Sequence, residues 1–185
     1  MIADVLAETA EKMHKAVSHG REEFATIRTG RASPSFVEKL TVDYYGSDVP
    51  LRQIAGFTIP EARTLVIQPY DKTSVGAIEK AIRNSDLGLN PSSDGNVLRL
   101  SFPALTADRR KEYVKMVRAM AEEGRVAIRN LRRAARQQLE ALEKDGAMGA
   151  DDLERAEKEL DKLTATNIVD LDVALEHKEQ ELIEV

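Results

Sequence analysis

Arginine recurs at regular intervals in one segment of this 185-residue chain. The segment from 106 to 136 holds 10 basic and 4 acidic residues, whereas the segment from 137 to 185 holds 5 basic and 15 acidic residues. The formal charge of the whole chain is −5, so the average hides the basic stretch. A guanidinium group donates two parallel hydrogen bonds to a phosphate and stays charged at any working pH. The pattern therefore indicates a surface that binds a chain of phosphates, as RNA-binding proteins do.

These arginines form a stripe on one flank of the predicted helix at ~100° per residue. With Leu131 taken as the centre of the apolar face, five of them lie between roughly 100° and 160° around the helix, and Arg133 lies at about 200°. The six side chains are called the arginine stripe: Arg118, Arg125, Arg129, Arg132, Arg133 and Arg136. The positions predicted to face the helix bundle are Val117, Met120, Gly124, Ala127, Ile128, Leu131, Ala135, Gln138 and Leu142.

A solvated helix face, whose arginines pair with acids on the last helix, is the alternative interpretation. Two features favour the RNA-binding interpretation. Only Glu122 and Glu123 are acidic between 118 and 136, so pairing within the helix is expected to be sparse. The predicted wheel also places the stripe mostly outside the seam between helices.

Gly124 costs about 1 kcal/mol in mid-helix relative to Ala, and we expect it to be a close-packing site on the bundle face.

The elements that carry the stripe follow from the hydrophobic spacing. Apolar and small residues recur at steps of three and four over 2–29, over 106–144 and from about 151 onward, which predicts three long helices. All six prolines fall between 31 and 105, together with apolar runs at 40–45, 53–59, 64–68 and 97–102 and a short helical pattern at 74–84. The sequence predicts an α+β protein. It has an elongated three-helix bundle, 1–30 plus 105–185, and an inserted small β/α/β domain, 31–104, with hinges near 30–34 and 103–106.

Several classes of chemistry lack their residues in this sequence. Without Cys there is no disulfide and no thiolate site, and without a Gly-x-x-x-x-Gly-Lys-Ser/Thr loop the chain is not expected to hydrolyse GTP. His14, His19 and His177 are not spaced as a metal pair. Asp151 and Asp152 are expected to cap a helix. Neither a signal peptide nor an apolar stretch of about 18 residues is found, so we expect a soluble cytoplasmic protein that is no enzyme and holds no metal or cofactor.

Six motifs, in one order over the whole chain, resemble the bacterial ribosome recycling factor family. They are residues 28–34 (RTGRASP), 44–46 (YYG), 50–53 (PLRQ), 79–82 (EKAI), 85–91 (SDLGLNP) and 125–133 (RVAIRNLRR). The resemblance implies an L-shaped protein in which a flexible hinge joins the bundle to the insert. The hinge residues are expected to be Gly30, Arg31, Ala32, Ser33, Pro34, Pro103, Ala104, Leu105 and Thr106.

The same resemblance implies a function. Members bind the large ribosomal subunit after termination and, with elongation factor G and GTP, split the ribosome. By motif match, Arg132 is the main contact to large-subunit ribosomal RNA, Arg129 and Arg133 support it, and Arg28 and Arg31 lie at the hinge end. We expect the other stripe arginines to bind RNA as well, the insert and hinge to face elongation factor G, and the chain to be a monomer.

Two other classes of protein stay open at this point. A cochaperone or coiled-coil adapter would fit the acidic net charge, would dimerise through its helices and would have no affinity for RNA. An RNA-modifying enzyme is the other class, and the sequence offers no candidate site for it.

Overall fold

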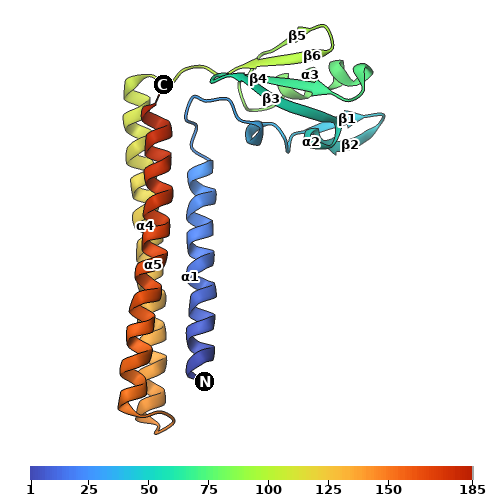
Figure 1. Cartoon of the computed structure of the whole chain (residues 1–185). Coiled ribbons are helices and arrows are strands. Elements are labelled where there is room, and N and C mark those ends of the chain that lie inside the picture. The colour runs from blue at the N-terminus through green and yellow to red at the C-terminus, as the bar shows by residue number, and fades with distance from the viewer. Residues whose placement is uncertain (185) are drawn as a thin grey trace. The chain divides into compact units, whose positions relative to one another are not determined.

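The computed structural model of the chain describes residues 1–184, which fall into two units. The bundle consists of residues 1–28 and the chain from 107 onward, and the insert consists of Thr29–Thr106 (Figure 1). Three long helices and a small β-sheet unit confirm the predicted α+β class. No helix within residues 1–184 is long and apolar enough to cross a membrane.

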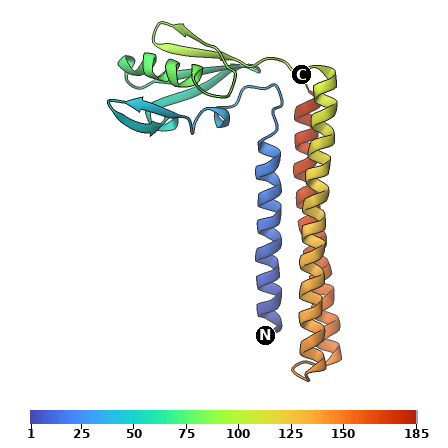
Figure 2. The ribbon, with the colours of Figure 1, turned by 180° about the vertical axis from the view of Figure 1, so that it is seen from behind.

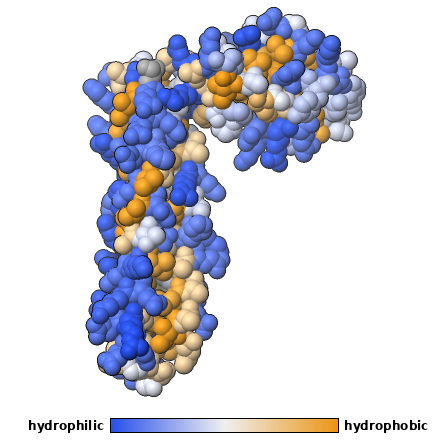
Figure 3. All heavy atoms as spheres, viewed as in Figure 1, coloured by the Kyte–Doolittle hydropathy of each residue, from blue (hydrophilic) through white to orange (hydrophobic). Residues whose placement is uncertain are grey.

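The bundle is built from α1 (Ile2–Ala25), α4 (Ala107–Lys144) and α5 (Ala150–Ile183). In both views α4 and α5 lie side by side, and the turn between them is at the end of the bundle where α1 begins (Figures 1 and 2). The helix predicted over 2–29 ends four residues earlier, although Ile27 beyond its end is still buried. Apolar side chains of all three helices are buried in the bundle, among them Met13, Val117 and Leu160. On the face drawn in Figure 3, hydrophilic residues cover most of the bundle.

The start of α5 differs from the prediction. Asp151 and Asp152 do not cap this helix, because its N-cap residue is Gly149 and no side chain caps it. The two carboxylates lie instead in the first turn of α5. There they face the positive end of the helix dipole, which stabilises them without a capping hydrogen bond.

One side chain of α5 is wedged between the other two helices. Leu171 is fully buried, and a methyl group added to Gly124 of α4 would lie 2.7 Å from its Cδ2 atom. A methyl group added to Gly20 of α1 would lie 2.7 Å from its Cδ1 atom. The two glycines therefore let α1 and α4 approach α5 more closely than any other residue would permit. The prediction that Gly124 is a close-packing site is confirmed.

The insert contains a four-stranded antiparallel sheet in the order β3-β4-β6-β5 and a separate hairpin of β1 and β2. Its strands are β1 (Thr41–Tyr44), β2 (Ser47–Pro50), β3 (Ala55–Glu61), β4 (Thr64–Pro69), β5 (Pro91–Asp94) and β6 (Val97–Ser101). Its helices are α2 (Leu51–Ile54) and α3 (Val75–Arg83), with 3-10 turns at Pro34–Phe36 and Lys72–Ser74. The sequence patterns located β1, β3, β4, β6 and α3 but missed β2, β5 and α2.

Apolar residues at alternate positions of the central strands form the core of the insert. Leu65 and Ile67 of β4 are paired with Leu100 and Leu98 of β6, and all four side chains are fully buried. Ile78 and other apolar residues of α3 belong to the same core. Strands with a period of two and a helix with a period of 3.6 thus bury their apolar residues in one layer.

The first and the last segment of the insert are both hydrogen-bonded to the turn between β3 and β4. The amide of Ala32 donates to the carbonyl of Ala62 at 2.8 Å, and the amide of Phe102 donates to the carbonyl of Arg63 at 2.8 Å. Gly30 has a φ of 78°, and a methyl group on it would lie 3.3 Å from the amide nitrogen of Leu105. The first and the last segment of the insert therefore run close together.

The glycine contact yields a prediction for stability. Gly124→Ala should destabilise the bundle by about 1–2 kcal/mol, because overpacking outweighs the gain of about 1 kcal/mol in helix propensity. Leu171 cannot turn away from the new methyl group without approaching Gly20. Urea unfolding followed by circular dichroism measures the change.

Two control variants separate the clash from other effects. Gly76→Ala, where nothing lies within 4 Å of the new carbon, should not destabilise the protein. In a Leu171→Ala background, Gly124→Ala should be neutral or stabilising. An equal loss in both backgrounds would show that the glycine–leucine contact is not the cause.

Candidate RNA-binding surface

All six side chains of the arginine stripe lie on α4, but the helix is rotated relative to the prediction. Its buried residues are Val117, Ala121, Ile128, Ala135 and Leu139. At ~100° per residue the centre of this buried face lies about 50° closer to the stripe than the predicted centre. Ala127 and Gln138 are exposed and Leu131 is only half-buried, so the predicted bundle face was partly wrong. The stripe consequently borders the seam with α5.

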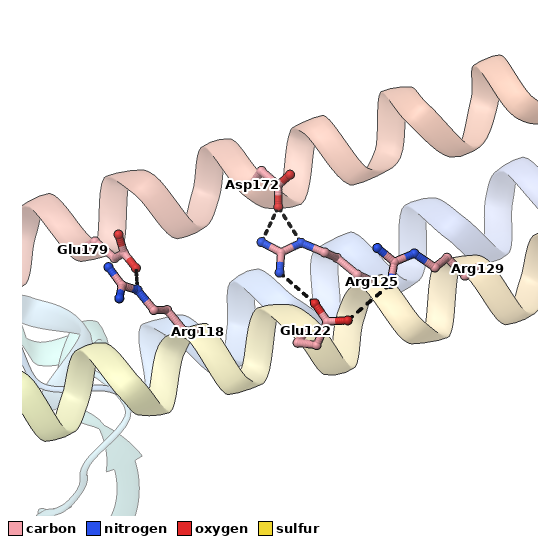
Figure 4. Close-up of polar contacts among 6 residues, drawn as sticks. All are labelled: Arg118, Glu122, Arg125, Arg129, Asp172 and Glu179. Carbon is pink, nitrogen blue, oxygen red and sulfur yellow. Dashed lines mark hydrogen bonds and ion pairs between the residues drawn. The ribbon is translucent and has the colours of Figure 1, made fainter.

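Arg125 is the most enclosed member of the stripe. Its side chain is 21% exposed, and two of its nitrogens contact Asp172 Oδ1 of α5, Nη2 at 2.6 Å and Nε at 2.8 Å (Figure 4). Its Nη1 donates to Glu122 at 3.0 Å. Burial opposes the charged form, but the hydrogen bonds to both carboxylates outweigh it and raise the pKa of Arg125. This arginine joins α4 to α5.

The neighbouring arginines are paired as well. Arg118 donates from Nε to Glu179 of α5, and this hydrogen bond raises the pKa of Arg118 (Figure 4). Arg129 donates to Glu122 at 3.2 Å. Glu122 thus bridges two arginines, and these contacts, with that of Arg125 the strongest, lower the pKa of Glu122. Glu122 thus pairs with two arginines within α4, where the sequence interpretation expected sparse pairing.

The pairing is loosest at Arg132 and Arg133, just before the last arginine of the stripe. Arg136 donates to Glu140 at 3.0 Å, and its Nε lies 3.1 Å from Glu157 of α5. Arg132 Nη1 is 3.8 Å from Asp161 Oδ1, too far for a hydrogen bond. Arg133 is exposed and makes no ion pair within residues 1–184. Two adjacent arginines are therefore weakly held or unpaired.

The alternative interpretation, pairing with acids of the last helix, is right about the geometry. Four stripe arginines contact carboxylates of α5. Three of the stripe, Arg125, Arg129 and Arg136, contact carboxylates of α4. The expectation that α5 would reach only the edge of the stripe was wrong, because the buried face of α4 lies closer to the stripe than the wheel placed it. The six facing carboxylates are Glu122, Glu140, Glu157, Asp161, Asp172 and Glu179.

The two remaining predicted RNA-binding residues lie outside α4. Arg28 and Arg31 are both half-buried in the segment that follows α1, Arg28 as the last residue of the bundle before the insert and Arg31 within the insert. Neither belongs to the stripe, and their predicted role stays a prediction. The three histidines are exposed, and no group of three or more metal-ligating side chains occurs in the described part of the chain.

The insert carries a polar cluster whose interactions the sequence did not reveal. Tyr45 has a φ of 52°, unusual for a residue other than glycine, and its ring is 76% exposed. Its hydroxyl donates to Asp71 at 2.7 Å and lies 2.9 Å from the hydroxyl of Thr73. Asp71 accepts hydrogen bonds from Tyr45 and from the hydroxyl and amide of Thr73, and these, that of Tyr45 first, lower the pKa of Asp71 to about 2. The carboxylate ties the β1–β2 hairpin to the segment before α3.

Comparison with known proteins gives one consistent family. The sequence model of the ribosome recycling factor family matches residues 20–183. The chain is 57% identical to the ribosome-recycling factor of Acidothermus cellulolyticus and 58% identical to that of Nocardioides sp., over 185 residues and the full length of both proteins in each case.

Two solved structures are similar over nearly the whole chain. A solution structure of a ribosome recycling factor is 41% identical, has a TM-score of 0.80, and the match covers 100% of this chain and 98% of that one. The second describes the T. thermophilus ribosome recycling factor and E. coli elongation factor G bound to the E. coli post-termination complex. That factor is 48% identical with a TM-score of 0.68, and the match covers 98% of each chain.

The polar cluster of the insert yields a prediction for pH dependence. Because the pKa of Asp71 is lower in the folded state, its charge stabilises the insert above pH 3.8, and this stabilisation is lost as the pH falls from 3.8 to about 2. Asp71→Asn keeps an acceptor oxygen but lacks the charge. It should lower the urea midpoint at pH 7, and the difference from wild type should shrink below pH 3.8.

Tyrosine fluorescence suits this measurement, since Tyr44, Tyr45 and Tyr70 lie in the insert and only Tyr113 lies in the bundle. Asp48→Asn is the control, because Asp48 is exposed on the neighbouring strand β2. A difference between wild type and Asp71→Asn that stays constant from pH 7 to pH 3 would contradict the assignment.

Proposed function

The chain belongs to the ribosome recycling factor family, and we propose that it binds the large ribosomal subunit after termination and, with elongation factor G and GTP, splits the ribosome for reuse. The family match carries the proposal, because it extends across both the bundle and the insert. A related factor of known structure was described together with elongation factor G on a post-termination complex, which supports the same partner here.

The arginine stripe is the proposed contact to large-subunit ribosomal RNA. Arg132 is the principal residue, with Arg129 and Arg133 beside it, because this part of the stripe carries the least tightly held guanidinium groups. Arg125 mainly holds α4 to α5, and Arg118 and Arg136 contribute from either end. Arg28 and Arg31 add contacts near the insert. A rigid helix with regularly spaced cations suits recognition of RNA by its shape.

The energy for splitting comes from the partner in this proposal. The sequence has no phosphate-binding loop for GTP, so GTP hydrolysis is assigned to elongation factor G. The chain is proposed to act in the cytoplasm, as a monomer, by binding at its place on the ribosome. The insert and the hinge are proposed to face that factor.

The proposed hinge can be narrowed. Ala32 is buried and hydrogen-bonded to the β3–β4 turn, and Ser33 accepts a hydrogen bond from the amide of Ser35 to cap the turn at Pro34–Phe36. These residues belong to the insert as a rigid part of it. Bending is therefore assigned to residues 30–31 and 103–106, which are the remaining parts of the predicted hinge.

A recycling assay tests the proposed function. The purified protein should stimulate the breakdown of post-termination polysomes when elongation factor G and GTP are present, and omission of either should abolish the stimulation. Elongation factor G from the same species and from a distant one should be compared, because the insert is proposed to contact it. Absence of stimulation with the matched factor would sink the proposal.

The role of Arg132 has its own test. Arg132→Ala should weaken binding to large subunits by about 1–3 kcal/mol, which is roughly 5- to 150-fold, because charge-assisted hydrogen bonds are lost. Helix content and thermal stability should stay at the wild-type level. Arg125→Ala is the matched contrast, since it should lower stability by breaking the contacts to Asp172 and Glu122. If Arg132→Ala unfolds or binds normally, the assignment is wrong.

A further inference from the structure

A hollow of about 300 Å³ lies between α4 and α5 at the loosely paired part of the stripe. It is lined by Arg132, Arg133, Arg136, Glu157, Leu160 and Asp161. Guanidinium groups form the wall on α4, and carboxylates form the wall on α5. Such a set of cations is suited to a phosphate group, and the carboxylates lie where the phosphate oxygens would bind.

Asp161 is held less firmly than the other carboxylates of α5 that contact the stripe. Asp161 is 70% exposed and 3.8 Å from Arg132, whereas Asp172 is contacted by two nitrogens of Arg125. Exposed ion pairs contribute little to stability, while an enclosed pair with two contacts costs more to break. An incoming phosphate can therefore displace Asp161 more easily than Asp172, while Glu157, whose carboxylate lies 3.1 Å from Arg136, lines the hollow beside it.

A displaced carboxylate still acts on the ligand. It stays within a few ångströms of the phosphate, inside the distance at which salt screens charges, and repels it. The repulsion is present for every polyanion. An RNA whose fixed shape supplies several phosphates to the stripe at once can offset it, whereas a flexible polyanion gains fewer simultaneous contacts and loses a larger share of its affinity.

We propose that Asp161 and Glu157 compete with RNA phosphates for Arg132 and Arg136, and so restrict the arginine stripe to structured RNA over other polyanions. This inference rests on the proposed function, in which the stripe binds ribosomal RNA. It assigns a specificity-determining role to two acids of α5 that belong to no RNA-binding motif in the sequence.

The test compares binding of two probes, purified large ribosomal subunits and poly(U), to the full chain over a series of salt concentrations. The variant is Asp161→Asn combined with Glu157→Gln, and each single change is measured too. We expect the double variant to bind poly(U) about tenfold tighter, since two charges facing the phosphates are removed, and large subunits only about two- to threefold tighter.

Asp170 provides a matched control. It is an exposed aspartate of the same helix that makes no ion pair within residues 1–184, and at ~100° per residue it lies on the side of α5 opposite Asp172. Asp170→Asn combined with Glu159→Gln, a second exposed acid that at ~100° per residue lies on the same side of α5 as Asp170, removes the same number of charges. This control should change the affinity for either probe by less than about twofold, because its charges lie away from the stripe.

The outcomes separate the two proposals. Tighter binding of poly(U) by the double variant, with a reduced preference for large subunits, supports the inference. If the double variant matches the control, or if both affinities rise by the same factor, the inference is overturned and the proposed function stands. If the wild-type chain does not bind large subunits at all, both are overturned.

Discussion

The close contact of Leu171 with two glycines determines how the basic and acidic helices meet. Gly124 precedes Arg125 in α4, and Leu171 precedes Asp172 in α5, so the packing contact and the ion pair involve adjacent residues on both helices. The short approach that the glycine permits brings the carboxylate within reach of the guanidinium. A larger residue at either glycine would separate the helices and weaken the pairing along the seam.

The arrangement explains how an acidic chain can carry a cationic surface. The excess of basic residues in α4 is opposed by the excess of acidic residues in α5, and the two helices are packed side by side. The enclosed pair at Arg125 contributes to the bundle, while Arg132 and Arg133 remain accessible to a ligand. In the proposed function, one stripe of a single residue type therefore serves two purposes, and the depth of each arginine in the seam decides between them.

Much of the fold could be predicted from the sequence, because long helices and central strands have clear hydrophobic periods. The bounds of α4 and the position of α3 follow from them, and the six motifs indicate the family. Strands β2 and β5 escaped prediction because each has only four residues, one of them Pro, and at most one other apolar side chain. The stripe was found, but its partners were not. A wheel centred on Leu131 cannot show that two neighbouring helices bury α4 on a face rotated toward the arginines, and the link between Tyr45 and Asp71 spans 26 residues.

The attachment of both connecting segments to the β3–β4 turn has a consequence for how the bundle assembles. Helices α1 and α4 are distant in the sequence, and bringing them together from an unfolded chain requires closing the long loop between residues 28 and 107. A folded insert already holds Gly30 next to Leu105. The chain entropy lost in closing the loop is therefore offset by the folding of the insert's own sheet and core. Once the insert is folded, bringing α1 and α4 together therefore costs little more chain entropy than if a short turn joined the two helices.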